Sequence, residues 1–97
     1  MILVTGSLVA KEGNLDEALR LSLEHVHRSR LEPGCISHAV HQDAENPSRL
    51  VFLEEWTDEA ALTTHFAVPA TRTFARTLSD LAEGSPQLAI YEAKRVR

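Results

Sequence analysis

The fold is decided by residues 32–56, which read EPGCISHAVHQDAENPSRLVFLEEW. Pro33 and Gly34 end a preceding helix, because proline interrupts helical hydrogen bonding and glycine accepts the left-handed conformation of a C-terminal cap. Residues 35–42 alternate between apolar and polar side chains, and the polar residues 43–48 precede a second β-rich run at residues 49–56. This pattern predicts two antiparallel strands joined by a hairpin loop.

The two predicted strands share a face that mixes apolar side chains with a carboxylate and an imidazole. In residues 49–56 it carries Leu50, Phe52, Glu54 and Trp56. In residues 35–42 it carries Ile36, His38 and Val40. The opposite face of residues 49–56 is also apolar, at Val51 and Leu53, and a strand that is apolar on both faces is usually covered on both.

Residues 2–10 predict a first strand that is also apolar on both faces. A helix follows, for which Asn14 and Glu17 predict a capping box. Its buried stripe is predicted from residues at helical spacing, which are Leu15, Ala18, Leu19, Ser22, Leu23 and Val26. His25 and His27 lie outside this stripe, and we expect both in solvent.

A second helix is predicted after Thr57, which we expect to be its N-cap. Its inner side carries Leu62, His65 and Phe66. Pro69 interrupts this helix and opens a further helical piece, which residues 83–86 end. Residues 88–94 predict the last strand.

The element order predicts an α+β fold of the ferredoxin-like βαββαβ type, with a four-stranded antiparallel sheet and the helices on one face. The other face would leave apolar side chains in water. We therefore expect a second copy of the chain to cover it, which gives a homodimer through the sheet faces.

Composition narrows the classes of protein and partner. The 97 residues suit a single domain, residues 1–97. The net charge of −4, with a basic cluster only at residues 94–97, argues against a nucleic-acid partner. The single cysteine, Cys35, excludes an intrachain disulfide. No signal peptide or membrane-spanning run is recognisable, so we expect a cytoplasmic protein without a membrane partner.

The chain resembles the antibiotic biosynthesis monooxygenase (ABM) family of dimeric α+β barrels over nearly its whole length. The residues that carry the resemblance are Glu32-Pro33-Gly34-Cys35, Asp43, Asn46-Pro47, Phe52 to Trp56, Asp58, Ala60-Ala61-Leu62, His65, Phe66 and Pro69. Similar proteins include cofactor-free monooxygenases of aromatic polyketides, quinol monooxygenases, heme-degrading enzymes and an isomerase of a small phosphorylated signalling metabolite. One fold therefore serves several reactions.

The resemblance implies that His65 lies in the pocket as a general base or substrate anchor. Imidazole titrates near neutral pH, which suits proton abstraction from a phenol or quinol. The alternative is a core histidine that is bonded to a backbone carbonyl. Trp56 is the second candidate catalytic residue, because a flat substrate would stack on it, and core packing is its alternative.

The candidate substrate-binding residues are Phe52, Glu54, His38, Phe74 and Arg72. A buried carboxylate at Glu54 would need a partner, which Arg72 or His65 would supply, and a structural ion pair is its alternative role. His38 would enter the same pocket or lie in solvent at a sheet edge.

We expect no flavin and no metal, because the chain has no glycine-rich phosphate loop and no histidine pair at metal-ligand spacing. The heme-degrading relatives combine an Asn on the first strand with the Trp and His, and residues 4–7 contain no Asn. We predict a cofactor-independent monooxygenase of a small phenol or quinol. The alternatives are an isomerase or lyase of a small oxo-metabolite, and a non-catalytic ligand-binding dimer.

Overall fold

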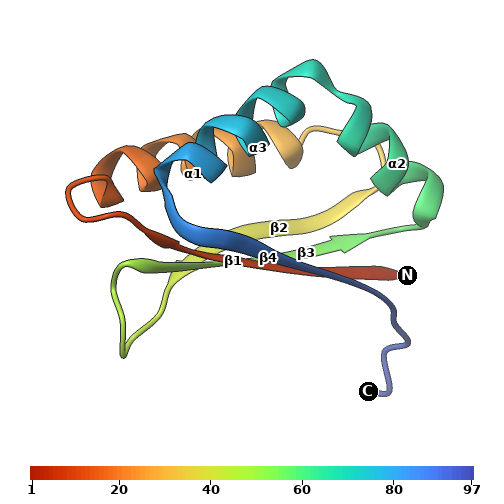
Figure 1. The fold of residues 1–97 in the computed structure, drawn as a ribbon. Coiled ribbons are helices and arrows are strands. Elements are labelled where there is room, and N and C mark those ends of the chain that lie inside the picture. Colours follow the sequence, from red (N-terminus) through yellow and green to blue (C-terminus); the bar gives the residue numbers. More distant parts are fainter.

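Three helices cover one face of a four-stranded sheet in the computed structural model, which describes residues 1–97 (Figure 1). The elements are β1 (Ile2–Ala10), α1 (Leu15–Ser29), β2 (Cys35–Gln42), β3 (Arg49–Trp56), α2 (Glu59–Ala67), α3 (Pro69–Leu81) and β4 (Ala82–Glu92). The strand order is β2-β3-β1-β4, and all neighbours are antiparallel. The predicted ferredoxin-like α+β fold is confirmed.

The hairpin of β2 and β3 forms with the predicted strand bounds. Its register places His38 opposite Glu54 and Val40 opposite Phe52, so a histidine and a carboxylate meet on the helix-covered face. The register shifts between Cys35 and Ser37, which turns Ile36 out of the predicted face and leaves it exposed. A local irregularity of this kind cannot be read from a period-two pattern.

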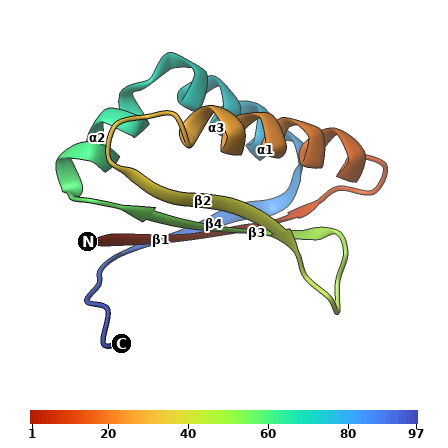
Figure 2. The same cartoon turned by 180° about the vertical axis from the view of Figure 1, so that it is seen from behind.

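Gly34 fixes the turn between α1 and β2 against the start of α2. Its φ of +83° lies in the left-handed region, and a Cβ atom there would lie 2.5 Å from Cβ of Ala61. The carbonyl oxygen of Gly34 accepts a hydrogen bond from the backbone N–H of Thr57 at 2.9 Å. Figure 2 shows this turn beside α2 when the molecule is seen from behind. The turn therefore carries Glu32 towards the helix that holds His65.

The helix caps differ from the predicted ones. The side chain of Asp58, not Thr57, accepts the backbone N–H of Ala61 at 2.8 Å and caps α2. Asn14 occupies the N-cap of α1 without a side-chain hydrogen bond, so no capping box forms. The predicted break at Pro69 is confirmed, because Pro69 is the first residue of α3.

Two further predictions are wrong, one about Leu23 and one about the start of the last strand. Leu23 is 42% exposed and lies outside the buried stripe of α1. The last strand begins at Ala82, six residues before the predicted start, because Gly84 at φ +70° and a register shift opposite Ser7 to Val9 let the strand continue through an irregular segment.

The helix-covered face holds two hydrophobic clusters. The larger lies below α1 and α3 and comprises Leu8, Ala10, Ala18, Val26, Leu50, Phe52, Leu78 and Ala82. The smaller lies towards α2 and comprises Ile2, Val4, Trp56 and Leu62. On the other face of the sheet, Leu53 and Tyr91 are 45% and 52% exposed. None of the three helices combines the length and apolar composition that a membrane crossing requires.

Candidate active site

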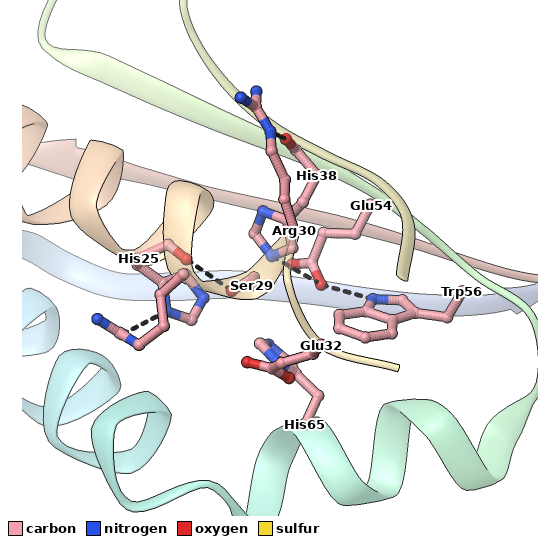
Figure 3. Close-up of polar contacts among 9 residues, drawn as sticks. His25, Ser29, Arg30, Glu32, His38, Glu54, Trp56 and His65 are labelled. Carbon is pink, nitrogen blue, oxygen red and sulfur yellow. Dashed lines mark hydrogen bonds and ion pairs between the residues drawn. The ribbon is translucent and has the colours of Figure 1, made fainter. Parts of the chain in front are cut away.

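A group of buried polar side chains interrupts the apolar layer between the sheet and the helices. His25 comes from α1, His38 from β2, Glu54 from β3 and His65 from α2, and all four are buried. Figure 3 shows the three imidazoles turned towards a common centre, with Glu54 and Trp56 beside it. Burying a polar side chain costs free energy unless it forms a hydrogen bond or an ion pair. The contacts of each of these four side chains therefore indicate its possible role.

His65 is paired with Glu32, a residue of the turn after α1. Nδ1 of His65 lies 2.7 Å from Oε1 of Glu32, and the imidazole is 2% exposed (Figure 3). The carboxylate can only accept, so Nδ1 carries the proton and Nε2 has the free lone pair. This pairing orients the ring and would stabilise its positive charge if Nε2 accepted a proton.

Glu54 has two neighbours that the sequence did not indicate. The Trp56 indole donates its Nε1–H to Oε1 of Glu54 at 3.0 Å. Nε2 of His38 lies 3.2 Å from the same oxygen. Burial by itself raises the pKa of the Glu54 carboxyl, but His38, the Trp56 N–H and His65 together lower it below the ordinary value. Glu54 is therefore a buried carboxylate.

Neither Arg72 nor His65 forms a hydrogen bond with Glu54, although His65 is near enough to help lower the pKa of its carboxyl. Arg72 lies on the exposed side of α3, where its guanidinium donates to the carbonyl oxygen of Phe66 at 3.4 Å. Position 72 follows the buried Thr71 by one residue, and a helix turns such neighbours about 100° apart. Arg72 is thus directed away from the polar group.

His25 is buried, against the expectation that it lies in solvent. Its ring stacks on Phe74 with centroids 4.0 Å apart and planes 8° apart, and its Nδ1 accepts a hydrogen bond from Arg28 at 3.1 Å. Burial, aided by His38 and His65, lowers the pKa of His25 to about 3, so the ring is neutral. The signal was present in the sequence, because position 25 follows the buried Ala18 by seven residues, which is two helical turns.

A cavity of about 210 Å³ opens beside these side chains. Of the predicted site residues, Phe52, Glu54, His65 and Phe74 line it, and His25, Phe66 and Leu88 complete much of its wall. Trp56 and His38 do not line it, because both are almost fully buried behind Glu54 and His65. Trp56 therefore contacts His65 and Glu54 and not the space that a ligand would occupy.

In this arrangement, Nε2 of His65 is a proton acceptor at the wall of a largely apolar cavity, and the carboxylate of Glu32 is bonded to the other nitrogen of the same ring. The arrangement offers no obvious thiol nucleophile, because burial and the nearby carboxylates Glu32 and Glu54 raise the pKa of the half-buried Cys35. It also brings together three histidines that the sequence spacing did not connect, since they come from three separate elements.

The comparisons with known proteins agree with the fold. Residues 1–77 match the model of a family described as antibiotic biosynthesis monooxygenase. An uncharacterized protein of Synechocystis sp. is 33% identical over 91 residues, which are 94% of this chain and 62% of that protein. The Synechocystis protein is therefore considerably longer than the part that this chain matches.

Solved structures are similar over nearly the whole chain. A conserved protein from Methanosarcina mazei Go1 is 30% identical, with a TM-score of 0.91 over 96% of this chain and 92% of that one. A Deinococcus radiodurans protein, provisionally named an antibiotic biosynthesis monooxygenase, is 25% identical, with a TM-score of 0.94 over 100% of this chain and 96% of that one.

Proposed function

Because the chain belongs to the antibiotic biosynthesis monooxygenase family, we propose that it is a cofactor-independent monooxygenase of a small phenol or quinol. The observation that carries this proposal is the Glu32–His65 pair at the wall of the cavity. The cavity volume of about 210 Å³ is below the about 300–1,000 Å³ of sites for drug-sized ligands. A substrate with a single aromatic ring suits this space.

In the proposed reaction, Nε2 of His65 takes the proton of a substrate hydroxyl while Glu32 stabilises the resulting imidazolium. The phenolate is electron-rich and reduces dioxygen without a further cofactor. One oxygen atom then joins a ring carbon, the other leaves as water, and the ring becomes a quinone. The protein contributes proton transfer, orientation of the ring between Phe52 and Phe74, and exclusion of water.

The test is oxygen uptake with a panel of one-ring phenols and quinols. His65→Ala should lower turnover by roughly 10²–10⁴, the usual contribution of a general base. His41→Ala is the matched control, because His41 is an exposed histidine of β2 outside the cavity. An unchanged rate in folded His65→Ala would leave the proposal without its base. If no compound of the panel consumes oxygen but several raise the melting temperature, the protein is a ligand-binding dimer instead.

We also propose that this chain pairs through the uncovered face of its sheet, where Leu53 and Tyr91 are about half exposed. Leu53→Lys would place a charge in the interface and should dissociate the dimer. Leu23→Lys on the outer side of α1 is the control, since Leu23 is similarly exposed but lies away from the sheet. Sedimentation should give twice the chain mass for the wild type and the control. A monomeric wild type would contradict the assembly but not the reaction.

A further inference from the structure

The three buried imidazoles form a compact set of nitrogen donors on three rigid elements. One ring nitrogen from each of His25, His38 and His65 can be chosen so that all lie within 4.8 Å of one another. Their exposed fractions are 4%, 1% and 2%. Figure 3 shows that the side chains approach from α1, β2 and α2 and enclose one small volume. Donors that are held by packed elements need little reorganisation to take up a ligand.

Of the three histidines, His38 is the one with a buried, unsatisfied ring nitrogen. Both of its ring nitrogens are buried; Nε2 has the Glu54 carboxylate 3.2 Å away, whereas Nδ1 has no hydrogen-bond partner. A buried polar atom without a partner costs about 1–3 kcal/mol relative to a satisfied one. A species that accepts a nitrogen lone pair at the centre of the cluster would remove this cost.

We propose that His25, His38 and His65 together bind one divalent transition-metal ion of the Zn²⁺ class. Imidazole nitrogen suits zinc and its first-row neighbours, whereas Mg²⁺ and Ca²⁺ require oxygen ligands. Zn–N bonds of about 2.0–2.1 Å place tetrahedral ligands about 3.4 Å apart. The donors here lie at most 4.8 Å apart, so small side-chain movements complete the site.

Two carboxylates support a cation at this position. Glu32 accepts from Nδ1 of His65 at 2.7 Å, which leaves Nε2 as the ligand atom and provides the carboxylate–histidine contact common behind metal ligands. Glu54 adds a second negative charge, 3.2 Å from Nε2 of His38. The cavity reaches both His25 and His65, so an ion can enter and keep an open coordination position towards it.

The guanidinium of Arg28 disfavours the binding of a metal ion at this cluster. It donates to Nδ1 of His25 at 3.1 Å, which places a positive charge beside the cluster and leaves the proton of the neutral ring on Nε2. An ion bound through Nε2 of His25 must break this contact. Arg28 thus weakens metal binding, and its removal should strengthen it.

This binding goes beyond the proposed oxygenase reaction. An ion on Nε2 of His65 occupies the lone pair that would accept the substrate proton, so the metal-bound protein cannot use His65 as a base. Metal binding is measured without substrate. Its failure therefore leaves the proposed reaction untouched, and a failed reaction leaves the metal site untouched.

The experiment titrates chelator-treated protein with Co²⁺, followed by visible d–d absorption, and with Zn²⁺, followed by calorimetry. We expect one ion per chain, with the absorption of a nitrogen-ligated site. His25→Ala and His38→Ala should weaken binding at least about tenfold, as loss of one of three ligands would. His27→Ala and His41→Ala are matched controls, because they remove exposed histidines of the same two elements. Unchanged affinity in the first pair, or no binding by the wild type, overturns the proposal.

Arg28→Met keeps the inference testable if the alanine variants fail to fold. This substitution retains an apolar stem of similar length and leaves the three histidines in place. Zn²⁺ affinity should rise about tenfold or more, since a repelling charge and a competing hydrogen bond are both removed. Arg76→Met, on the exposed side of α3, should leave affinity unchanged. Equal or weaker binding in Arg28→Met than in the wild type overturns the proposal.

Discussion

The two ends of the helix-covered face of the sheet are built from different chemistry. At the apolar end, eight buried hydrophobic residues, among them Leu50 and Val26, form one cluster. At the histidine end, His25, His38, His65, Glu54 and Trp56 are buried in the same layer. The first end stabilises the fold by removing apolar surface from water. The second buries polar groups that stabilise little in net terms, so its composition indicates a site more than a core.

Leu50→Ala should have the largest effect on stability, because it acts at the apolar end. Leu50 is fully buried, and the substitution leaves a cavity in a close-packed cluster. The free energy of unfolding should fall by about 2–5 kcal/mol. Urea unfolding measures it, with Leu23→Ala as an exposed control that should cost no more than about 0.5 kcal/mol. If both variants lost the same free energy of unfolding, Leu50 would contribute no more to stability than an exposed leucine, which would contradict its place in the core.

Trp56→Phe should cost less, about 1–3 kcal/mol, through the loss of one hydrogen bond to a buried carboxylate. The indole does not line the cavity, so the expected stacking of a flat substrate on Trp56 has no space there. The informative design is a double-mutant cycle with Glu54→Gln. Trp56→Phe should destabilise the Glu54→Gln protein less than the wild type. An additive result would mean that the Trp56–Glu54 contact contributes nothing.

The same contrast explains what the sequence could predict. The β2–β3 hairpin follows from alternation and turn chemistry, which are local, so its bounds were correct. The outward turn of Ile36 and the early start of β4 depend on irregular pairing between strands, which no single segment encodes. Pattern reasoning therefore works best where neighbouring residues alone fix the conformation.

The site was predicted in part for a related reason. His65, Glu54 and Phe52 share faces that helical and strand periods define, and they do line the cavity. The partner of His65 is Glu32, which is 33 residues away and is delivered by the turn at Gly34. Long-range pairs of this kind depend on how elements dock, so neither this contact nor the meeting of three histidines could be read from spacing.

Acid should destabilise the histidine end between about pH 6.5 and pH 3. The pKa of His25 is about 3 in the folded protein and 6.5 as the reference for the unfolded chain. The unfolded state therefore binds the extra proton in this window, and stability is complete above pH 6.5 and falls as the pH drops through it. At pH 5 the loss from this group is at most about 2 kcal/mol.

His25→Phe tests this assignment, because phenylalanine can stack on Phe74 and cannot bind a proton. Urea unfolding at pH 7 and pH 5 should show a smaller loss in this variant than in the wild type. Glu54 does not interfere, since its lowered pKa acts only below its reference value of 4.5. Equal losses in the two proteins would assign the acid sensitivity to other groups.

Glu32→Gln should change stability least and separate function from folding most clearly. The Gln side-chain oxygen can still accept from Nδ1 of His65, and the position is partly exposed, so the free energy of unfolding should change by less than about 1 kcal/mol. The negative charge that stabilises the imidazolium is lost, however. Turnover on an accepted substrate should therefore fall roughly 10–10³-fold. Glu59→Gln, an exposed carboxylate on α2, is the matched control. Unchanged turnover would show that the charge of Glu32 does not support the base, whereas lower turnover at unchanged stability identifies Glu32 as the group that does.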